Sequence, residues 1–69
     1  MIRTNKPDVE VNNHGSLVLL TPRTERASHW IRDHVHTEPY NWLGHSLAVE
    51  HRYADAIIKG MQRDDLAVA

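Results

Sequence analysis

Polar and apolar residues alternate near the start of the chain in a way that predicts a β-hairpin. Residues 8–11 read Asp-Val-Glu-Val, which is typical of a half-buried strand. Residues 12–15, Asn-Asn-His-Gly, tolerate the positive φ angles that a hairpin turn requires. The run from Ser16 to Leu20 is apolar after its first residue, so we expect this return strand to lie in the centre of a sheet.

A helix is predicted over residues 22–35, because apolar residues recur there at helical spacing. These residues are Ala27, Trp30, Ile31 and Val35. Thr21 followed by Pro22 favours a start at that point, since threonine caps a helix and proline fits its first position. Thr24 is the alternative N-cap.

The second half of the chain predicts a strand and a helix after a linker at residues 36–44. Residues 45–50 alternate in polarity and are predicted to form the third strand, and a helix follows over residues 51–63. The apolar stripe of this helix consists of Tyr53, Ala54, Ile57, Ile58 and Met61. Gly60 should weaken the helix by up to about 1 kcal/mol relative to alanine, unless a neighbour packs closely there. Residues 66–68 could add a short edge strand.

These elements together predict an α+β domain with the order β-β-α-β-α. Each helix has one apolar face, so we expect a two-layer packing in which both helices cover one face of a short sheet. The domain should span residues 8–69, after a flexible polar leader at residues 1–7. A chain of 69 residues is long enough for one domain and too short for two.

Composition narrows the classes of protein to which the chain can belong. There is no cysteine, which excludes disulfides, thiol catalysis and thiolate metal sites. The formal net charge of −1 argues against strong nonspecific DNA binding, which needs a basic surface. No apolar run approaches the roughly 20 residues of a membrane span, and no signal peptide is recognisable, so we expect a cytoplasmic protein without membrane contact.

No sequence motif for catalysis or cofactor binding stands out. No serine lies in a Gly-x-Ser-x-Gly elbow, the glycines do not cluster into a phosphate-binding loop, and H-E-x-x-H is absent. A domain of this size also rarely encloses a substrate pocket. We therefore expect no enzymatic activity, no catalytic residue and no cofactor.

Two aromatic residues in the predicted linker, Tyr40 and Trp42, are candidates for contact with a partner. Tryptophan, tyrosine and arginine are enriched where protein interfaces hold most of their binding energy, so Arg32 on the preceding helix joins them. An exposed Trp42 would suit a partner protein or a homodimer interface. The alternative is that the linker folds back and caps the end of the sheet.

The predicted helix and the residues just after it could form two other kinds of site. A nucleic-acid-binding surface would use Arg23, Arg26, His29 and Arg32. Its alternative is a solvated face of mixed charge, because acidic residues interrupt it and the net charge is not basic. His34 and His36 form an H-x-H pair that could bind zinc with a nearby acid, and the alternative is a polar helix end.

Several segments carry a resemblance to a known group of proteins. They are residues 15–22 (GSLVLLTP), Trp30, residues 42–44 (WLG) and residues 47–53 (LAVEHRY). In this pattern the chain resembles small uncharacterised proteins encoded by bacteriophages and prophages of proteobacteria. The resemblance implies an accessory protein in a bacterial host cell that binds a host or phage protein. Inhibitors of host defence, such as anti-CRISPR proteins, are one class of such proteins.

Overall fold

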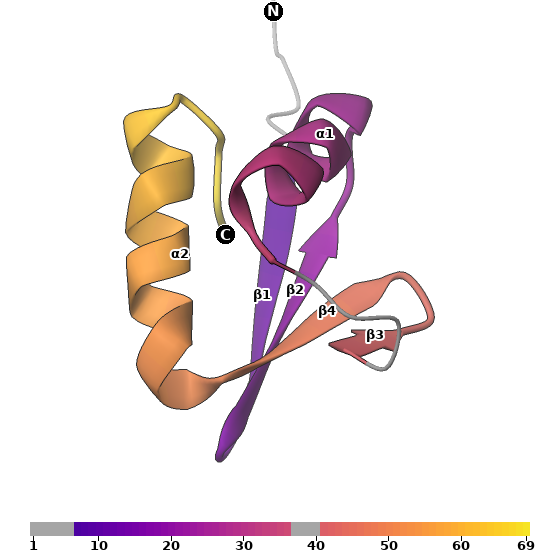
Figure 1. Cartoon of the computed structure of the whole chain (residues 1–69), viewed down its shortest axis with the longest axis vertical. Helices are drawn as coiled ribbons and strands as arrows, with labels where there is room; N and C mark the ends of the chain where they lie inside the picture. The colour runs from indigo at the N-terminus through magenta and orange to yellow at the C-terminus, as the bar shows by residue number, and fades with distance from the viewer. Residues whose placement is uncertain (1–6, 37–40) are drawn as a thin grey trace, which may run out of the picture.

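The computed structural model describes residues 7–36 and 41–69, which form a four-stranded sheet and two helices (Figure 1). In chain order the elements are β1 (Val9–His14), β2 (Leu17–Pro22), α1 (Glu25–His34), β3 (Trp42–Leu43), β4 (Ser46–Glu50) and α2 (His51–Arg63). This arrangement confirms the predicted α+β class and the order of the long elements. The additional element is β3, a short strand inside the predicted linker. Residues 1–6 of the predicted leader lie outside the described residues.

All strand pairings in the sheet are antiparallel, and the order across it is β1-β2-β4-β3. The central position of β2, between β1 and β4, is the one that its continuous apolar run predicts. The β1–β2 hairpin turns at Gly15, whose φ of 76° favours a residue without a side chain. The Asn13 side chain supports this turn by accepting a hydrogen bond from the Gly15 amide at 3.0 Å.

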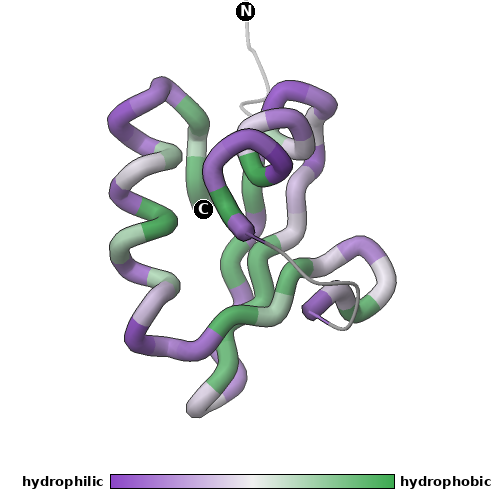
Figure 2. Tube along the Cα trace, in the orientation of Figure 1, coloured by the Kyte–Doolittle hydropathy of each residue, from purple (hydrophilic) through white to green (hydrophobic). Residues whose placement is uncertain are grey.

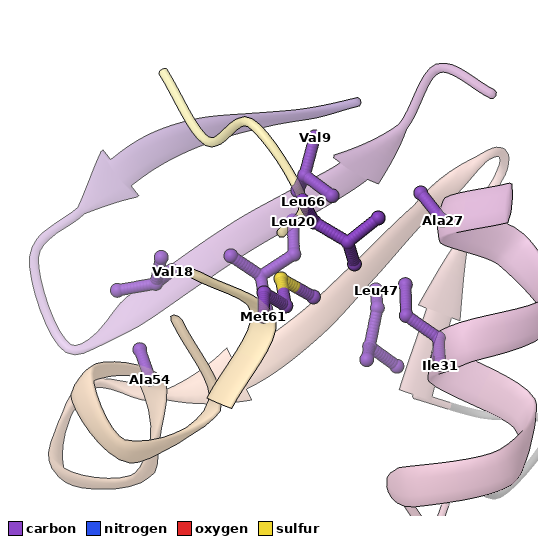
Figure 3. Close-up of a cluster of buried hydrophobic side chains, with 9 residues drawn as sticks. All are labelled: Val9, Val18, Leu20, Ala27, Ile31, Leu47, Ala54, Met61 and Leu66. Carbon is purple, nitrogen blue, oxygen red and sulfur yellow. The ribbon is translucent and has the colours of Figure 1, made fainter. Parts of the chain in front are cut away.

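The hydrophobic core lies between the sheet and the two helices (Figure 3). Successive side chains on a strand face opposite sides of a sheet, so only alternate strand residues enter this layer. The buried strand residues are Val9, Val18, Leu20 and Leu47. The buried residues of the helices and the C-terminal segment are Ala27, Ile31, Ala54, Met61 and Leu66. These residues form one cluster, so both helices cover the same face of the sheet, as predicted.

Hydrophilic and hydrophobic residues alternate along α2 with the period of a helix that is buried on one side (Figure 2). Ala54 and Met61 are buried, and Ile57 and Ile58 pack against the core from partly buried positions. The prediction is wrong for Tyr53, which is 53% exposed. The guanidinium of the neighbouring residue, Arg52, lies 4.8 Å from the centre of its ring, so a charged side chain covers this ring in place of the core.

The first helix begins later than the signal at Thr21 and Pro22 predicts. Pro22 is the last residue of β2, and α1 starts at Glu25. Pairing with β1 continues through Pro22 and keeps the backbone extended there, which excludes a helix start at this point. The alternative cap, Thr24, is the N-cap, and its hydroxyl accepts a hydrogen bond from the Ala27 amide at 3.1 Å.

The C-terminal segment covers the outer edge of β1, beside α2 (Figure 1). Val68 forms one parallel bridge with Val9, so residues 66–68 pair with the sheet without forming a full strand. The Val11 amide also donates to the Ala69 carbonyl at 2.8 Å, and the Ala69 amide donates to the Val9 carbonyl at 3.0 Å. Backbone groups that an edge strand would otherwise expose are paired in this way.

Candidate functional site

An open cleft of about 750 Å³ lies between the end of β2, one side of α1 and the β3–β4 hairpin. Its polar and aromatic lining residues are Thr21, Arg23, Ser28, Arg32, Trp42 and His45. We call it the Arg32–Trp42 cleft, after the two predicted partner-binding residues that it brings together. This volume falls within the range of roughly 300–1,000 Å³ that is usual for ligand sites.

The helix wall of the cleft follows from the spacing of residues on α1. Ala27 and Ile31 are four residues apart and face the core, where both are fully buried. Ser28 and Arg32 are also four residues apart, one position further along, and therefore share the neighbouring side of the helix. The apolar stripe that anchors α1 thus determines which of its polar side chains face the cleft.

The opposite wall depends on the hairpin that joins β3 and β4. Trp42 pairs with Leu47 of β4, which places its side chain on the helix-covered face of the sheet. Its indole is partly buried against the core and lines the cleft with its remaining surface. The hairpin turns at Gly44, with a φ of 62°, and His45 follows at the rim of the cleft. Trp42 therefore both caps the end of the core and presents an aromatic surface to the cleft.

The charge of the cleft is one-sided in the described part of the chain. Two arginines and one histidine line it, and no described carboxylate does. Arg23 has one acidic neighbour outside the cleft, because its Nη1 atom lies 3.9 Å from Oε1 of Glu10. Arg32 makes no ion pair with any described residue. Within the described part of the chain, therefore, no carboxylate competes with a ligand for its guanidinium.

This combination of groups suits the binding of an anionic ligand. Guanidinium groups bind carboxylates and phosphates through paired hydrogen bonds, which are stronger than bonds between neutral groups. The serine and threonine hydroxyls can add hydrogen bonds, although that of Thr21 already lies 2.6 Å from the Ser46 hydroxyl. The Trp42 indole adds a flat surface on which an apolar or aromatic group can pack.

The structure divides the predicted nucleic-acid-binding residues between two sides of α1. Arg23 and Arg32 line the cleft, whereas Nη2 of Arg26 lies 4.0 Å from Oδ2 of Asp8 and donates to the Asp65 carbonyl. At 3.6 residues per turn, Arg26 and Arg32 are about 120° apart around the helix. His29 is exposed, and it is not among the residues that line the cleft. The four residues therefore do not form one continuous basic surface.

The predicted metal-binding histidines also lie in different surroundings. The His34 ring stacks on Trp30 with 4.4 Å between ring centres, its Nδ1 donates to the Trp30 carbonyl, and its Nε2 lies 3.8 Å from Oδ2 of Asp64. His36 instead lines a second hollow, whose other lining residues include Val49 and Ile57. Among residues 7–36 and 41–69, no cluster of three or more potential ligands could hold a metal ion.

Of the residues that line the cleft, Arg32 and Trp42 were predicted to bind a partner, whereas Ser28 and His45 were not. The third predicted residue, Tyr40, lies outside the described residues. The sequence does contain a signal for the hairpin that was missed. Gly44 and His45 separate two segments that can both form strands. Such a pair is typical of a two-residue hairpin turn, which would have placed Trp42 on a strand and His45 at its tip.

None of the helices in the described part of the chain is long and apolar enough to span a membrane. Comparison of the chain with protein-family models, with curated proteins and with solved structures found no match.

Proposed function

We propose that this chain acts by binding a partner protein, and that the Arg32–Trp42 cleft is the docking surface. One observation carries the proposal: Arg32 and Trp42 belong to different elements, and the fold brings them into one open cleft. Arginine and tryptophan are the residues most enriched at the energetic centres of protein interfaces. Binding without catalysis also fits a sequence that has no nucleophile or metal motif.

The resemblance to bacteriophage proteins supports a more specific form of this proposal. We infer that the partner is a host or phage protein in the bacterial cell. An 8.0 kDa protein can inhibit a larger machine by occluding the surface that the machine needs. Inhibition of host machinery, for example of a defence complex in the manner of an anti-CRISPR protein, is the mode of action that we propose.

Affinity capture with matched variants tests the docking surface. The full chain would be immobilised and exposed to nuclease-treated bacterial lysate, in parallel with Arg32→Ala and Trp42→Ala variants. Arg63→Ala and Tyr53→Ala serve as controls, since they remove an exposed arginine and an exposed aromatic residue outside the cleft. Circular dichroism would show that each variant is folded.

We expect the wild type and both controls to retain the same partner, and the two cleft variants to lose it. Nuclease treatment ensures that a protein is not captured through bound nucleic acid. Equal recovery of the same proteins by all five chains would contradict the proposal. Dimerisation of the wild-type chain in solution, lost in both cleft variants, would instead identify the cleft as a homodimer interface.

A further inference from the structure

We propose that the Arg32–Trp42 cleft recognises an acidic segment of the partner, in which carboxylates flank an apolar side chain. This inference rests on the proposed function, because it names the chemistry of the partner that the cleft would bind. The basic lining of the cleft, its size, its aromatic wall and the absence of a described ion-pair partner for Arg32 support it.

The basic side chains of the cleft come from separate positions along its walls. Arg23 follows the end of β2, Arg32 lies near the end of α1, and His45 lies at the hairpin tip. The described lining contains no acid, and Glu10, which lies beside Arg23, is outside the cleft. An acidic segment with more than one carboxylate can reach several of these groups, whereas a single small anion cannot fill a cleft of about 750 Å³.

A comparison with Arg26 on the same helix shows why Arg32 is the main candidate. Arg26 lies beside the Asp8 carboxylate and donates to the Asp65 carbonyl, so it has a structural role. Arg32 has no ion pair with a described residue and is exposed on the cleft side of the helix. A carboxylate bound to both donor groups of the Arg32 guanidinium would supply the ion-pair partner that the described residues do not.

Trp42 adds the apolar part of the recognition. Its indole is partly buried against the core, so it is held in place before a ligand arrives and loses little freedom on binding. An apolar side chain that packs on this indole would leave the neighbouring carboxylates of the same segment near Arg23 and Arg32. Alternation of acidic and apolar residues in the partner therefore fits the two kinds of wall.

Nucleic acid fits the same cleft less well. Binding of a phosphate backbone needs a continuous track of positive charge, whereas Arg26 lies about 120° around α1 from Arg32 and contacts the C-terminal segment instead of lining the cleft. The chain also has a formal net charge of −1, so its overall field does not attract a polyanion. A short acidic segment of a protein can instead be bound by the few basic side chains of the cleft, whatever the net charge of the chain.

A titration followed by NMR tests the inference with defined probes. The isotope-labelled full chain would be titrated with a short, terminally blocked peptide in which aspartate alternates with leucine. The matched peptide carries asparagine in place of aspartate, and a single-stranded oligonucleotide is the third probe. We expect the acidic peptide to shift the Trp42 indole and Arg32 side-chain signals, and to bind more weakly as ionic strength rises.

Variants assign the effect to the cleft. Arg32→Gln removes the charge from an exposed side chain, and we expect it to weaken the acidic peptide about tenfold, as for the loss of a charge-assisted hydrogen bond. Arg63→Gln, outside the cleft, should leave the affinity unchanged. Arg32→Glu should bind a lysine–leucine peptide better than the wild type does, which a variant that had merely lost its fold would not.

Several results would overturn the inference. They are equal binding of the aspartate and asparagine peptides, tighter binding of the oligonucleotide, and no shift at Trp42 up to millimolar peptide. The acidic-segment inference can also fail while the proposed function stands. If affinity capture of a partner is lost in Trp42→Ala but survives in Arg32→Gln and Arg23→Gln, the cleft binds a protein, but not through acidic residues.

Discussion

Asp8 shows how one carboxylate can join three distant parts of a small domain. Its Oδ1 atom accepts a hydrogen bond from the Thr24 hydroxyl at 2.8 Å, and its Oδ2 atom accepts one from the Ala67 amide at 2.9 Å. The first bond positions the N-cap of α1, and the second holds the C-terminal segment beside β1. Arg26 adds a positive charge 4.0 Å away.

These contacts make the stability of the protein depend on pH. The Ala67 amide, then the Thr24 hydroxyl and the Arg26 charge lower the pKa of Asp8 below its ordinary value of 3.8, against an opposing effect of burial. Because the folded state holds the charged form of Asp8 more tightly than the unfolded state does, this carboxylate stabilises the fold. The stabilisation is complete when the pH lies above the ordinary pKa. That stabilisation is lost as the pH falls from there through the folded-state pKa.

We therefore expect the free energy of unfolding to fall as acid is added below about pH 4, and Asp8→Asn to reduce this dependence. At neutral pH the same substitution should cost about 1–3 kcal/mol, because a hydrogen-bonded charge is removed. Asp55→Asn is the matched control, since Asp55 is exposed and, among the described residues, pairs only with Lys59 on the same helix. Urea unfolding at several pH values measures both effects, and identical behaviour of the two variants would contradict the role of Asp8.

At the scale of elements, the contact between the two helices depends on Gly60. A Cβ atom at this position would lie 3.3 Å from the ring of Trp30, which is closer than ordinary van der Waals contact. Two interactions hold the ring: its Nε1 donates to Oδ2 of Asp64 at 2.7 Å, and it stacks on His34. The glycine that weakens α2 as an isolated helix thus allows α1 to pack closely against it.

Gly60→Ala should consequently stabilise the protein by clearly less than the roughly 1 kcal/mol that helix propensity alone predicts. In a Trp30→Leu background the contact is gone, and the same change should give close to the full gain. Comparing the urea midpoints of each pair separates propensity from contact. An equal gain in both backgrounds would show that Trp30 does not restrict this position.

The elements with a strong period were predictable, and the short or competing ones were not. The apolar stripes of α1 and α2 and the alternation of β4 follow from residue spacing alone. The two residues of β3 are too few to show a period. The helix-start signal at Thr21–Pro22 is a local preference, and strand pairing with a distant segment overrides it. The residues around Thr21 and Pro22 give no information about this pairing.

For the candidate site, too, local sequence predicted some features and missed others. Arg32 and Trp42 were predicted as contact residues from residue type alone, because arginine and tryptophan are enriched at the energetic centres of protein interfaces. Their proximity was missed, since it depends on a hairpin whose first strand, β3, lies inside the predicted linker and whose one sequence signal is the Gly44–His45 turn. The division of Arg26 from Arg32 follows from helix geometry and could have been derived from spacing. The contact of Arg26 with the C-terminal segment could not.

For the whole molecule, stability should depend on whether a residue belongs to the core. Leu66 is 4% exposed and joins the C-terminal segment to the core, whereas Leu43 is 56% exposed and is not packed against the core. Leu66→Ala should cost about 2–4 kcal/mol through lost contacts and a cavity. Leu43→Ala, the same chemical change, should cost less than about 0.5 kcal/mol. Similar losses in thermal unfolding would contradict the position of the core.

The direct test of the central claim, that the Arg32–Trp42 cleft docks a protein, is site-specific photo-crosslinking in bacterial cells. A photoreactive residue would replace His45 at the rim of the cleft or, as a control, Gln62 on the exposed side of α2. Our account predicts a discrete crosslinked protein from position 45, lost when Arg32→Ala is added, and none from position 62. The same product from both positions, or no product from position 45 in cells that contain the captured partner, would contradict it.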